Sequence, residues 1–257
     1  MNPTTNLQYD GSFDGFLSCV FAVYEQKIST PTIQKEFQSN ADFFATTETV
    51  FTDAERAKRV WKAFCKKTTS KEQKDVFKIF LSEIKGVENT LLRYMQHTFK
   101  NDPSKDIDFS NKDILKISQV ARMVDREKHR MEAFVRFQLT TDQIYVSTVE
   151  PDFNVLPLII NHFKDRYADQ KWLIFDMKRK YGIFYDLLSV DTITFEHEAE
   201  LMLKKISDNY DDKESEFQQL WDTYYKNVNI KSRKNTKLHL QHLPKRYWKY
   251  LTEKKPQ

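Results

Sequence analysis

The spacing of apolar residues changes near residue 130, and this change restricts the folds that the chain can adopt. From 52 to 128 the apolar residues recur every three or four positions, as they do along one face of an α-helix. Between 131 and 195 they alternate with polar residues or form short β-branched runs, which is typical of β-strands. We therefore expect helices first and a sheet after them.

Residues 52–128 are predicted to form four helices. Thr52 with Glu55, and Ser70 with Gln73, have the spacing of a capping box. In that motif a hydroxyl and a side chain three residues later satisfy each other's free backbone N–H groups. We therefore expect helices to begin at Thr52 and at Ser70.

The first residues are predicted to form a short strand and then a helix. Leu7 to Asp10 is the strand candidate, and Ser12 is the expected N-cap of a helix that begins at Phe13. Gly11 lies between them, and glycine allows either a sharp backbone turn or the close approach of a ligand. A plain turn at Asp10-Gly11-Ser12 is the simpler interpretation.

The middle of the chain is predicted to form an antiparallel sheet with a helix packed on it, in the order ββαββ. The first two strands form a hairpin, and a fifth short strand follows the other four. The expected strands are 131–138, 144–149, 171–177, 181–187 and 192–195, and the helix begins near Val155. We expect further helices after residue 201. The prediction is a helix-rich single α+β domain at 1–257, with a mainly helical part at 1–128, a sheet-containing part at 129–196 and a helical, basic part at 197–257.

Charge is distributed unevenly along the chain. The formal net charge is only +4, but the stretch from Lys226 to Gln257 holds ten Lys or Arg residues and the single acid Glu253. Residues 1–225 therefore carry a net charge of −5. A local excess of positive charge favours binding of nucleic acid phosphates.

These basic residues are candidates for nucleic acid binding. Basic side chains attract phosphates whatever the base sequence, and aromatic side chains can stack on unpaired bases. The phosphate candidates in the tail are Arg233, Lys234, Lys237, Lys245, Arg246 and Lys249, and those that could extend the face are Arg122, Arg126, Arg130, Arg136, Lys178 and Arg179. Tyr247 is a candidate for base stacking. Pro244 is expected to begin a final short helix that directs Trp248 and Leu251 into the core.

Four carboxylates near the ends of the expected strands are weak candidates for catalysis. Glu150 and Asp152 follow one strand, Asp176 lies near the end of another, and Asp186 lies in a third. Paired carboxylates can bind a divalent metal ion or act as general acid and base. The alternative is a structural role, in which these residues cap turns and form ion pairs with nearby Lys or Arg residues.

Several classes of site are not indicated by the sequence. Cys19 and Cys65 are the only cysteines, so we expect neither a disulfide framework nor a cysteine-rich zinc site, and we predict a cytoplasmic protein. No phosphate-binding or dinucleotide-binding glycine motif is present, and we expect no cofactor and no metal. No signal peptide and no apolar run of about 18 residues is found, so we expect no membrane association.

Four stretches of the chain resemble a known family. They are YDGSFDGFLSCVFAVY, HRMEAFVRF, EPDFNVLPLIINHFKDRYADQKWLIFDMKRKYGIFYD and RKNTKLHLQHLPKRYWKYL. They are similar to an uncharacterised bacterial family described as probable DNA metabolism proteins. That domain is also found joined to uracil-DNA glycosylase domains in larger proteins, and its members are thought to be encoded beside a radical S-adenosylmethionine (radical SAM) protein assigned to DNA modification or repair.

The resemblance implies a role in DNA metabolism with a radical SAM protein as partner, and it transfers no catalytic residue. The chain cannot be the radical enzyme, because that iron–sulfur cluster needs three closely spaced cysteines. It also shows no glycosylase signature. The preferred hypothesis is a DNA-binding accessory protein. The alternatives are an enzyme that acts on DNA or nucleotides through the strand-end carboxylates, and a scaffold whose tail binds a protein.

Overall fold

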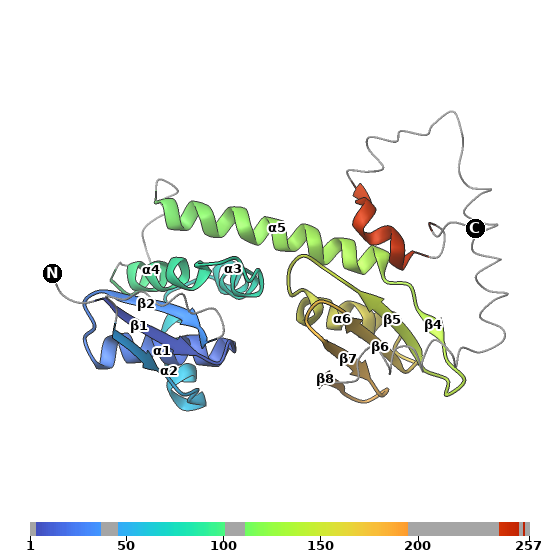
Figure 1. Ribbon diagram of the computed structural model, residues 1–257, viewed down its shortest axis with the longest axis horizontal. Helices are drawn as coiled ribbons and strands as arrows, with labels where there is room; N and C mark the ends of the chain where they lie inside the picture. Colours follow the sequence, from blue (N-terminus) through green and yellow to red (C-terminus); the bar gives the residue numbers. More distant parts are fainter. Residues whose placement is uncertain (1–3, 37–45, 101–110, 195–241, 252–253, 255–257) are drawn as a thin grey trace. The chain divides into compact units, whose positions relative to one another are not determined.

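The computed structural model describes residues 4–36, 46–100, 111–194, 242–251 and 254 (Figure 1). The chain forms two compact units, Met1–Val124 and Asp125–Gln257. Helix α5 (Lys112–Phe134) contains the boundary between them, and each unit is described here by itself. The expectation that the chain forms a single domain stays a prediction. None of the helices in these ranges is long and apolar enough to cross a membrane.

The first unit contains a small parallel sheet. Its central strand is β1 (Thr5–Tyr9), which pairs with β2 (Pro31–Lys35) on one side and β3 (Thr46–Thr49) on the other. The expected strand near Leu7 is confirmed. Strands β2 and β3 were not predicted, because they are short and mostly polar, and of their described residues only Ile33 is buried.

The turn between β1 and α1 (Phe13–Glu25) is organised by Asp10. Its carboxylate accepts hydrogen bonds from the N–H of Ser12 at 2.9 Å and from the hydroxyl of Thr52 at 2.7 Å. Ser12 caps α1 as expected, because its hydroxyl accepts the N–H of Gly15 at 2.9 Å. Gly11 has a φ of +87°, which lies in the left-handed region that glycine adopts without strain. These contacts account for the sequence Asp10-Gly11-Ser12 as a tight turn.

The four helices predicted between 52 and 128 are present. They are α2 (Ala54–Cys65), α3 (Ser70–Leu81), α4 (Val87–Lys100) and α5. Helix α3 begins at Ser70 as expected, and α2 begins at Ala54, two residues after Thr52, but the residues that cap them differ from the expected ones. Asp53 caps α2, and Thr69 forms a capping box with Glu72 at the start of α3. Thr69 and Ser70 each precede a Glu or Gln by three residues, so the spacing alone does not distinguish the two registers.

The second unit contains a five-stranded sheet in the order β4-β5-β6-β7-β8, which confirms the mixed α and β class. The strands are β4 (Gln138–Leu139), β5 (Tyr145–Val149), β6 (Trp172–Asp176), β7 (Tyr181–Tyr185) and β8 (Val190–Thr194). Helix α6 (Leu156–Arg166) buries Leu156, Ile159 and Phe163.

The sheet is mixed, and the prediction of a fully antiparallel sheet is wrong for one pair of strands. β5 and β6 pair in parallel, while the other three pairings are antiparallel. Helix α6 connects β5 to β6 and returns the chain to the end at which β5 began, and such a crossover makes the two strands parallel. The carboxyl ends of β5 and β6 therefore lie at the same edge of the sheet.

The expected strand at 131–138 is mostly wrong. Helix α5 continues to Phe134, and only Gln138 and Leu139 pair with β5. The buried residues around this point are Glu127, Met131 and Val135, which recur every four positions. That interval belongs to a helix and not to a strand.

The last described helix is the 3-10 helix η3 (Lys245–Tyr250), which follows Pro244 as expected. Tyr247 and Leu251 are fully buried, whereas Trp248 is only half-buried and donates its indole N–H to the carbonyl of Leu243 at 3.2 Å. The prediction that Trp248 enters the core is therefore wrong, while that for Leu251 is confirmed. The helices expected after residue 201 lie outside the described residues up to 241.

Candidate nucleic-acid interface

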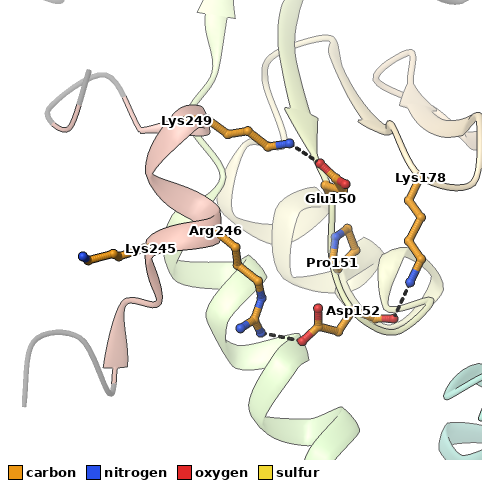
Figure 2. A pocket seen from close by; sticks show the side chains of 7 residues that line it. All are labelled: Glu150, Pro151, Asp152, Lys178, Lys245, Arg246 and Lys249. Carbon is orange, nitrogen blue, oxygen red and sulfur yellow. Dashed lines mark hydrogen bonds and ion pairs between the residues drawn. The ribbon is translucent and has the colours of Figure 1, made fainter. Parts of the chain in front are cut away.

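A pocket of about 420 Å³ opens in the second unit, where three segments meet (Figure 2). One segment follows β5, the second is the turn between β6 and β7, and the third is η3. Four basic and two acidic side chains line the pocket together with one proline. The lining residues are Glu150, Pro151, Asp152, Lys178, Lys245, Arg246 and Lys249.

The pocket lies at the carboxyl ends of the parallel strands β5 and β6. Val149 at the end of β5 is in register with Asp176 at the end of β6, so the segments that follow both strands emerge side by side. The first of these segments carries Glu150 and Asp152, and the second carries Lys178. This edge is the usual place for ligands in sheets with parallel strands and crossover helices.

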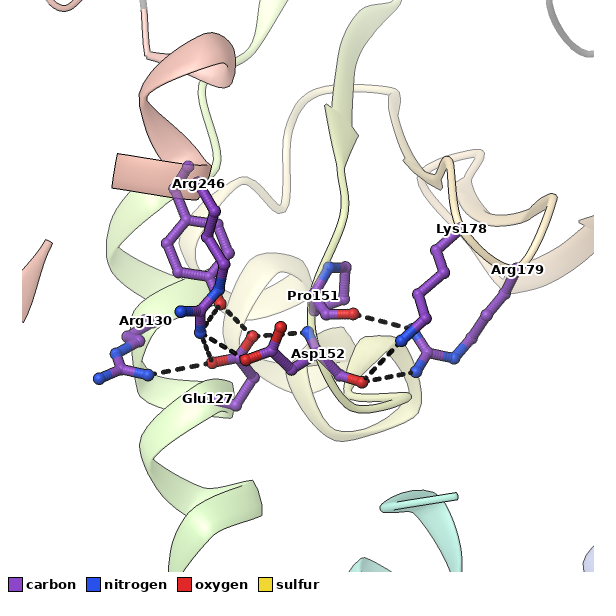
Figure 3. Close-up of polar contacts among 8 residues, drawn as sticks. Glu127, Arg130, Pro151, Asp152, Lys178, Arg179 and Arg246 are labelled. Atoms are coloured by element: carbon purple, nitrogen blue, oxygen red, sulfur yellow. Dashed lines mark hydrogen bonds and ion pairs between the residues drawn. The ribbon is translucent and has the colours of Figure 1, made fainter. Parts of the chain in front are cut away.

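Asp176 and Arg179 hold the wall of the pocket in place. Asp176 is fully buried, and its carboxylate accepts the backbone N–H groups of Lys178 and Arg179 at 2.9 and 3.1 Å. The guanidinium of Arg179 donates to Asp176 at 2.8 Å. It also donates to the carbonyl oxygens of Pro151 and Asp152 at 3.1 Å each (Figure 3). Asp176 therefore caps the turn and orients Arg179, and Arg179 fixes the segment after β5.

Glu127 on α5 connects the same segment to η3. Its side chain is only 1% exposed and accepts the backbone N–H of Asp152 at 2.8 Å. It also accepts the hydroxyl of Tyr247 and lies near the guanidinium groups of Arg130 at 3.3 Å and Arg246 at 3.6 Å (Figure 3). Three hydrogen-bond donors and the guanidinium of Arg246 thus surround one buried carboxylate and compensate its charge.

Tyr247 is part of this buried network. Burial, together with its hydrogen bond to Glu127, raises the pKa of Tyr247 far above the usual value of a tyrosine. The phenol therefore stays protonated and donates to Glu127 at any ordinary pH. With 1% of its surface exposed, Tyr247 cannot stack on a base, and the prediction of such a role is wrong.

Glu150 is paired with η3 from the other side of the pocket. It forms an ion pair with Lys249 (Figure 2). It also accepts a hydrogen bond from the hydroxyl of Tyr250 at 2.6 Å. The hydrogen bond from Lys249 lowers the pKa of Glu150, and the same bond raises the pKa of Lys249. Both side chains are largely exposed, so the pair is accessible to solvent and to ligands.

Asp152 and Arg246 form the second ion pair of the pocket. Arg246 Nη2 lies 2.5 Å from Asp152 Oδ2, and the side chains are 42% and 52% exposed, respectively. Lys178 Nζ donates to the carbonyl oxygen of Asp152 at 3.1 Å. A carbonyl has no formal charge, so this bond positions the ammonium group without neutralising it.

The structure brings four of the predicted phosphate ligands together, namely Lys178, Lys245, Arg246 and Lys249. Others are engaged elsewhere. Arg130 contacts Glu127, Arg179 contacts Asp176, and Arg136 donates to the carbonyls of Ala133 and Val135. Arg122 and Arg126 are exposed on α5, and Arg122 belongs to the first unit. Arg233, Lys234 and Lys237 lie outside the described residues.

The four candidate carboxylates do not converge as a group. Glu150 and Asp152 line the pocket, and Asp176 is buried at its base. Asp186 follows β7 at the opposite end of the sheet, where it accepts the N–H groups of Leu188 and Ser189 at 2.8 and 2.7 Å. Asp186 is therefore a turn cap, and its expected place in a shared site is wrong.

Glu127 was missed by sequence reasoning, although a signal for it exists. It lies in a run of basic residues on α5 that reads as a solvated face. Val120, Val124, Glu127 and Met131 are nevertheless all buried, at intervals of four, three and four. A charged residue at an apolar position of a helical stripe indicates a buried and satisfied charge.

Within the described residues, no group of three or more His, Cys, Asp or Glu side chains is arranged to hold a metal ion.

Comparison with known proteins gives one match. A family model described as a domain of unknown function, DUF4130, matches residues 85–253, which include every residue that lines the pocket. The chain has no significant match among curated proteins or among solved structures. Because the matched segment covers more than half of the chain, this protein belongs to the DUF4130 family.

Proposed function

We propose that this protein binds DNA through the pocket of its second unit and acts as an accessory protein in DNA repair or modification. The observation that carries the proposal is that Lys178, Lys245, Arg246 and Lys249 all line one pocket, with the ammonium group of Lys245 directed outward (Figure 2). Lys178 lies far from the other three in the sequence and reaches the pocket from the turn after β6. The fold therefore concentrates positive charge at one place.

The chemistry of these side chains suits phosphate. A phosphodiester carries one negative charge and accepts several hydrogen bonds, which Lys supplies as a compact ammonium group and Arg as a planar fork. Lys245 is exposed and forms no ion pair with any described residue, so its charge is available to a ligand. Arg246 and Lys249 are also accessible, at 42% and 59% exposure.

The family resemblance supports the assignment to DNA metabolism, and it is the only support for a radical SAM protein as partner. The four quoted motifs include the segment that follows β5, the end of β6 and the whole of η3, which together form the pocket. A DNA-binding pocket in such a protein would present the substrate to the radical enzyme. The three cysteines that this chemistry requires would come from that partner.

The test is binding of the purified protein to fluorescent single- and double-stranded DNA at low and at physiological salt. The pocket variant replaces Lys178, Lys245, Arg246 and Lys249 by Ala. The control variant replaces Lys58, Lys62, Lys71 and Lys74, which are exposed on α2 and α3, and removes the same charge. We expect the pocket variant to lose roughly 10-fold or more in affinity, because four phosphate contacts contribute strongly to salt-dependent binding.

The control should retain most of the wild-type affinity. Unfolding curves of both variants, compared with that of the wild type, check that each variant is folded. Equal losses in both variants would contradict the proposal, because they would reflect net charge and not a site. A wild type that does not bind DNA at low salt would also contradict it. The basic tail would then be tested for binding to the radical SAM protein.

An enzymatic role is the second candidate, because Glu150 and Asp152 line the same pocket. The pKa of Glu150 is lowered, so this carboxylate is ionised at neutral pH. An ionised carboxylate can hold a divalent cation or accept a proton. A change in the DNA during incubation with Mg²⁺ that disappears in Glu150→Gln would favour this role over simple binding.

A further inference from the structure

We infer that the pocket contains two phosphate subsites, and that one of the protein's own carboxylates occupies each of them in this structure. Glu150 occupies the subsite at Lys249 and Tyr250, and Asp152 occupies the subsite at Arg246. The inference rests on the proposed function and specifies the ligand at that site as neighbouring phosphates of one DNA strand. The two carboxylates are therefore competitors of DNA and not catalytic groups.

The first subsite is defined by two donors that meet at a single oxygen. The ammonium of Lys249 and the hydroxyl of Tyr250 both donate to Oε2 of Glu150. A phosphate oxygen accepts several hydrogen bonds in the same way, and charged donors make the strongest of them. Glu150 is 41% exposed, so an incoming phosphate can displace its side chain without opening the core.

The second subsite is defined by a difference between two acids that contact Arg246. Glu127 is 1% exposed and lies 3.6 Å from the guanidinium, whereas Asp152 is 52% exposed and lies 2.5 Å from it. Glu127 cannot leave without losing the hydrogen bonds of Tyr247 and of the Asp152 backbone. Glu127 thus keeps Arg246 in position, and Asp152 is the partner that a phosphate can replace.

The two subsites lie on the same short helix. Arg246 and Lys249 are three residues apart, which is one turn of a 3-10 helix and places them about 6 Å apart along its axis. This spacing suits neighbouring phosphates of one strand. Lys178 and Lys245 line the same pocket without an ion pair to any described carboxylate, and they add charge on either side.

Removal of the two carboxylate charges should therefore strengthen DNA binding. Glu150→Gln with Asp152→Asn keeps the shape of both side chains and leaves acceptors for Tyr250 and Arg246. The control is Asp165→Asn with Asp169→Asn, which makes the same change in charge at exposed residues at the far end of α6. The probe is a short fluorescent oligothymidylate, measured over a range of salt concentrations.

We expect the pocket double variant to bind the probe about 5-fold more tightly than the wild type, the scale set by two exposed ion pairs. Its affinity should also fall more steeply with salt, by about one to two units of the logarithmic slope, because two more cations become available to phosphates. The control should change by less than about 2-fold, because charges beyond a Debye length are screened.

Three results would overturn the inference. Weaker binding by the pocket variant would show that the carboxylates take part in binding, and equal gains in both variants would show a general charge effect. Inorganic phosphate that competes as well as the oligonucleotide at the same phosphate concentration would show a site for single phosphates. In each of these cases, DNA binding by the wild type would still support the proposed function. If none of the three proteins binds, the function and the subsites fail together.

Discussion

Arg246 has two acidic partners whose roles follow from their burial. Glu127 is enclosed by α5, the segment after β5 and η3, where it accepts three hydrogen bonds and forms an ion pair with Arg246. Asp152 faces solvent and makes a single side-chain ion pair, with Arg246. A buried charge that loses its partners is costly, whereas an exposed ion pair contributes little to stability. Glu127 therefore holds Arg246 in position, whereas Asp152 competes with DNA for Arg246.

The substitutions Glu127→Gln and Asp152→Asn should have opposite effects on DNA binding, although each removes one negative charge beside Arg246. Glu127→Gln removes the buried negative charge that Arg130 and Arg246 contact and should lower the free energy of unfolding by about 2–4 kcal/mol. It should also weaken DNA binding, because η3 is held less firmly. Asp152→Asn should cost less than about 1 kcal/mol and should strengthen binding.

Urea unfolding and binding of the oligothymidylate probe measure both effects. Affinities that shift in the same direction in the two variants would contradict the different roles of Glu127 and Asp152.

At the scale of elements, the sequence predicts the helices well and the edges of the sheets poorly. The stripes of α2 to α5 contain enough apolar residues at regular intervals to define each helix. Strands β2 and β3 lack an apolar pattern, and their place is set by pairing with β1, which is not local in the sequence. The parallel pairing of β5 with β6 likewise follows from the crossover through α6.

The site was predictable only in part, for a related reason. The charge run identifies Lys245, Arg246 and Lys249 as a group, but their meeting with Lys178 depends on the tertiary fold. The sequence does not show whether Tyr247 is buried, because tyrosine is common both in protein cores and on protein surfaces. In the fold, Tyr247 is buried and donates a hydrogen bond to Glu127, which lies 120 residues away in the sequence.

The contact between α4 and α5 in the first unit offers a test of pH dependence. Arg93 donates to both oxygens of Asp113, at 2.8 and 2.6 Å. The hydrogen bond from Arg93 lowers the pKa of Asp113. A carboxyl whose pKa is lower in the folded state stabilises the fold above its unfolded pKa, and this stabilisation is lost as the pH falls through the folded pKa.

Asp113→Asn should therefore lower the free energy of unfolding by about 0.5–1 kcal/mol at neutral pH, a small value because Arg93 is 55% exposed. The difference from the wild type should shrink as the pH is lowered through the acid range. Urea midpoints at neutral pH and at about pH 3 would measure it. An equal difference at both pH values would contradict this role of the ion pair.

For the whole molecule, the described end of the basic stretch, the helix η3, forms ion pairs with acids of the second unit. Arg246 and Lys249 in η3 contact acids near the carboxyl end of β5 and on α5, and Lys178 contributes a further cation from the β6–β7 turn. Helix η3 and the segments at the edge of the sheet together form one pocket, and the family match covers both. Net charge alone would not locate this site, because the acids that compete for it belong to the same unit.

Photo-crosslinking from the pocket is the most direct test that DNA binds there. A photoreactive amino acid would be placed at Lys245, which is exposed at the pocket, and in a second protein at Lys74, which is exposed on α3 in the first unit. After irradiation with single-stranded DNA, we expect a crosslink from position 245 that disappears at high salt, and little from position 74. Equal crosslinking from both positions, or crosslinking from position 74 alone, would contradict DNA binding at this pocket.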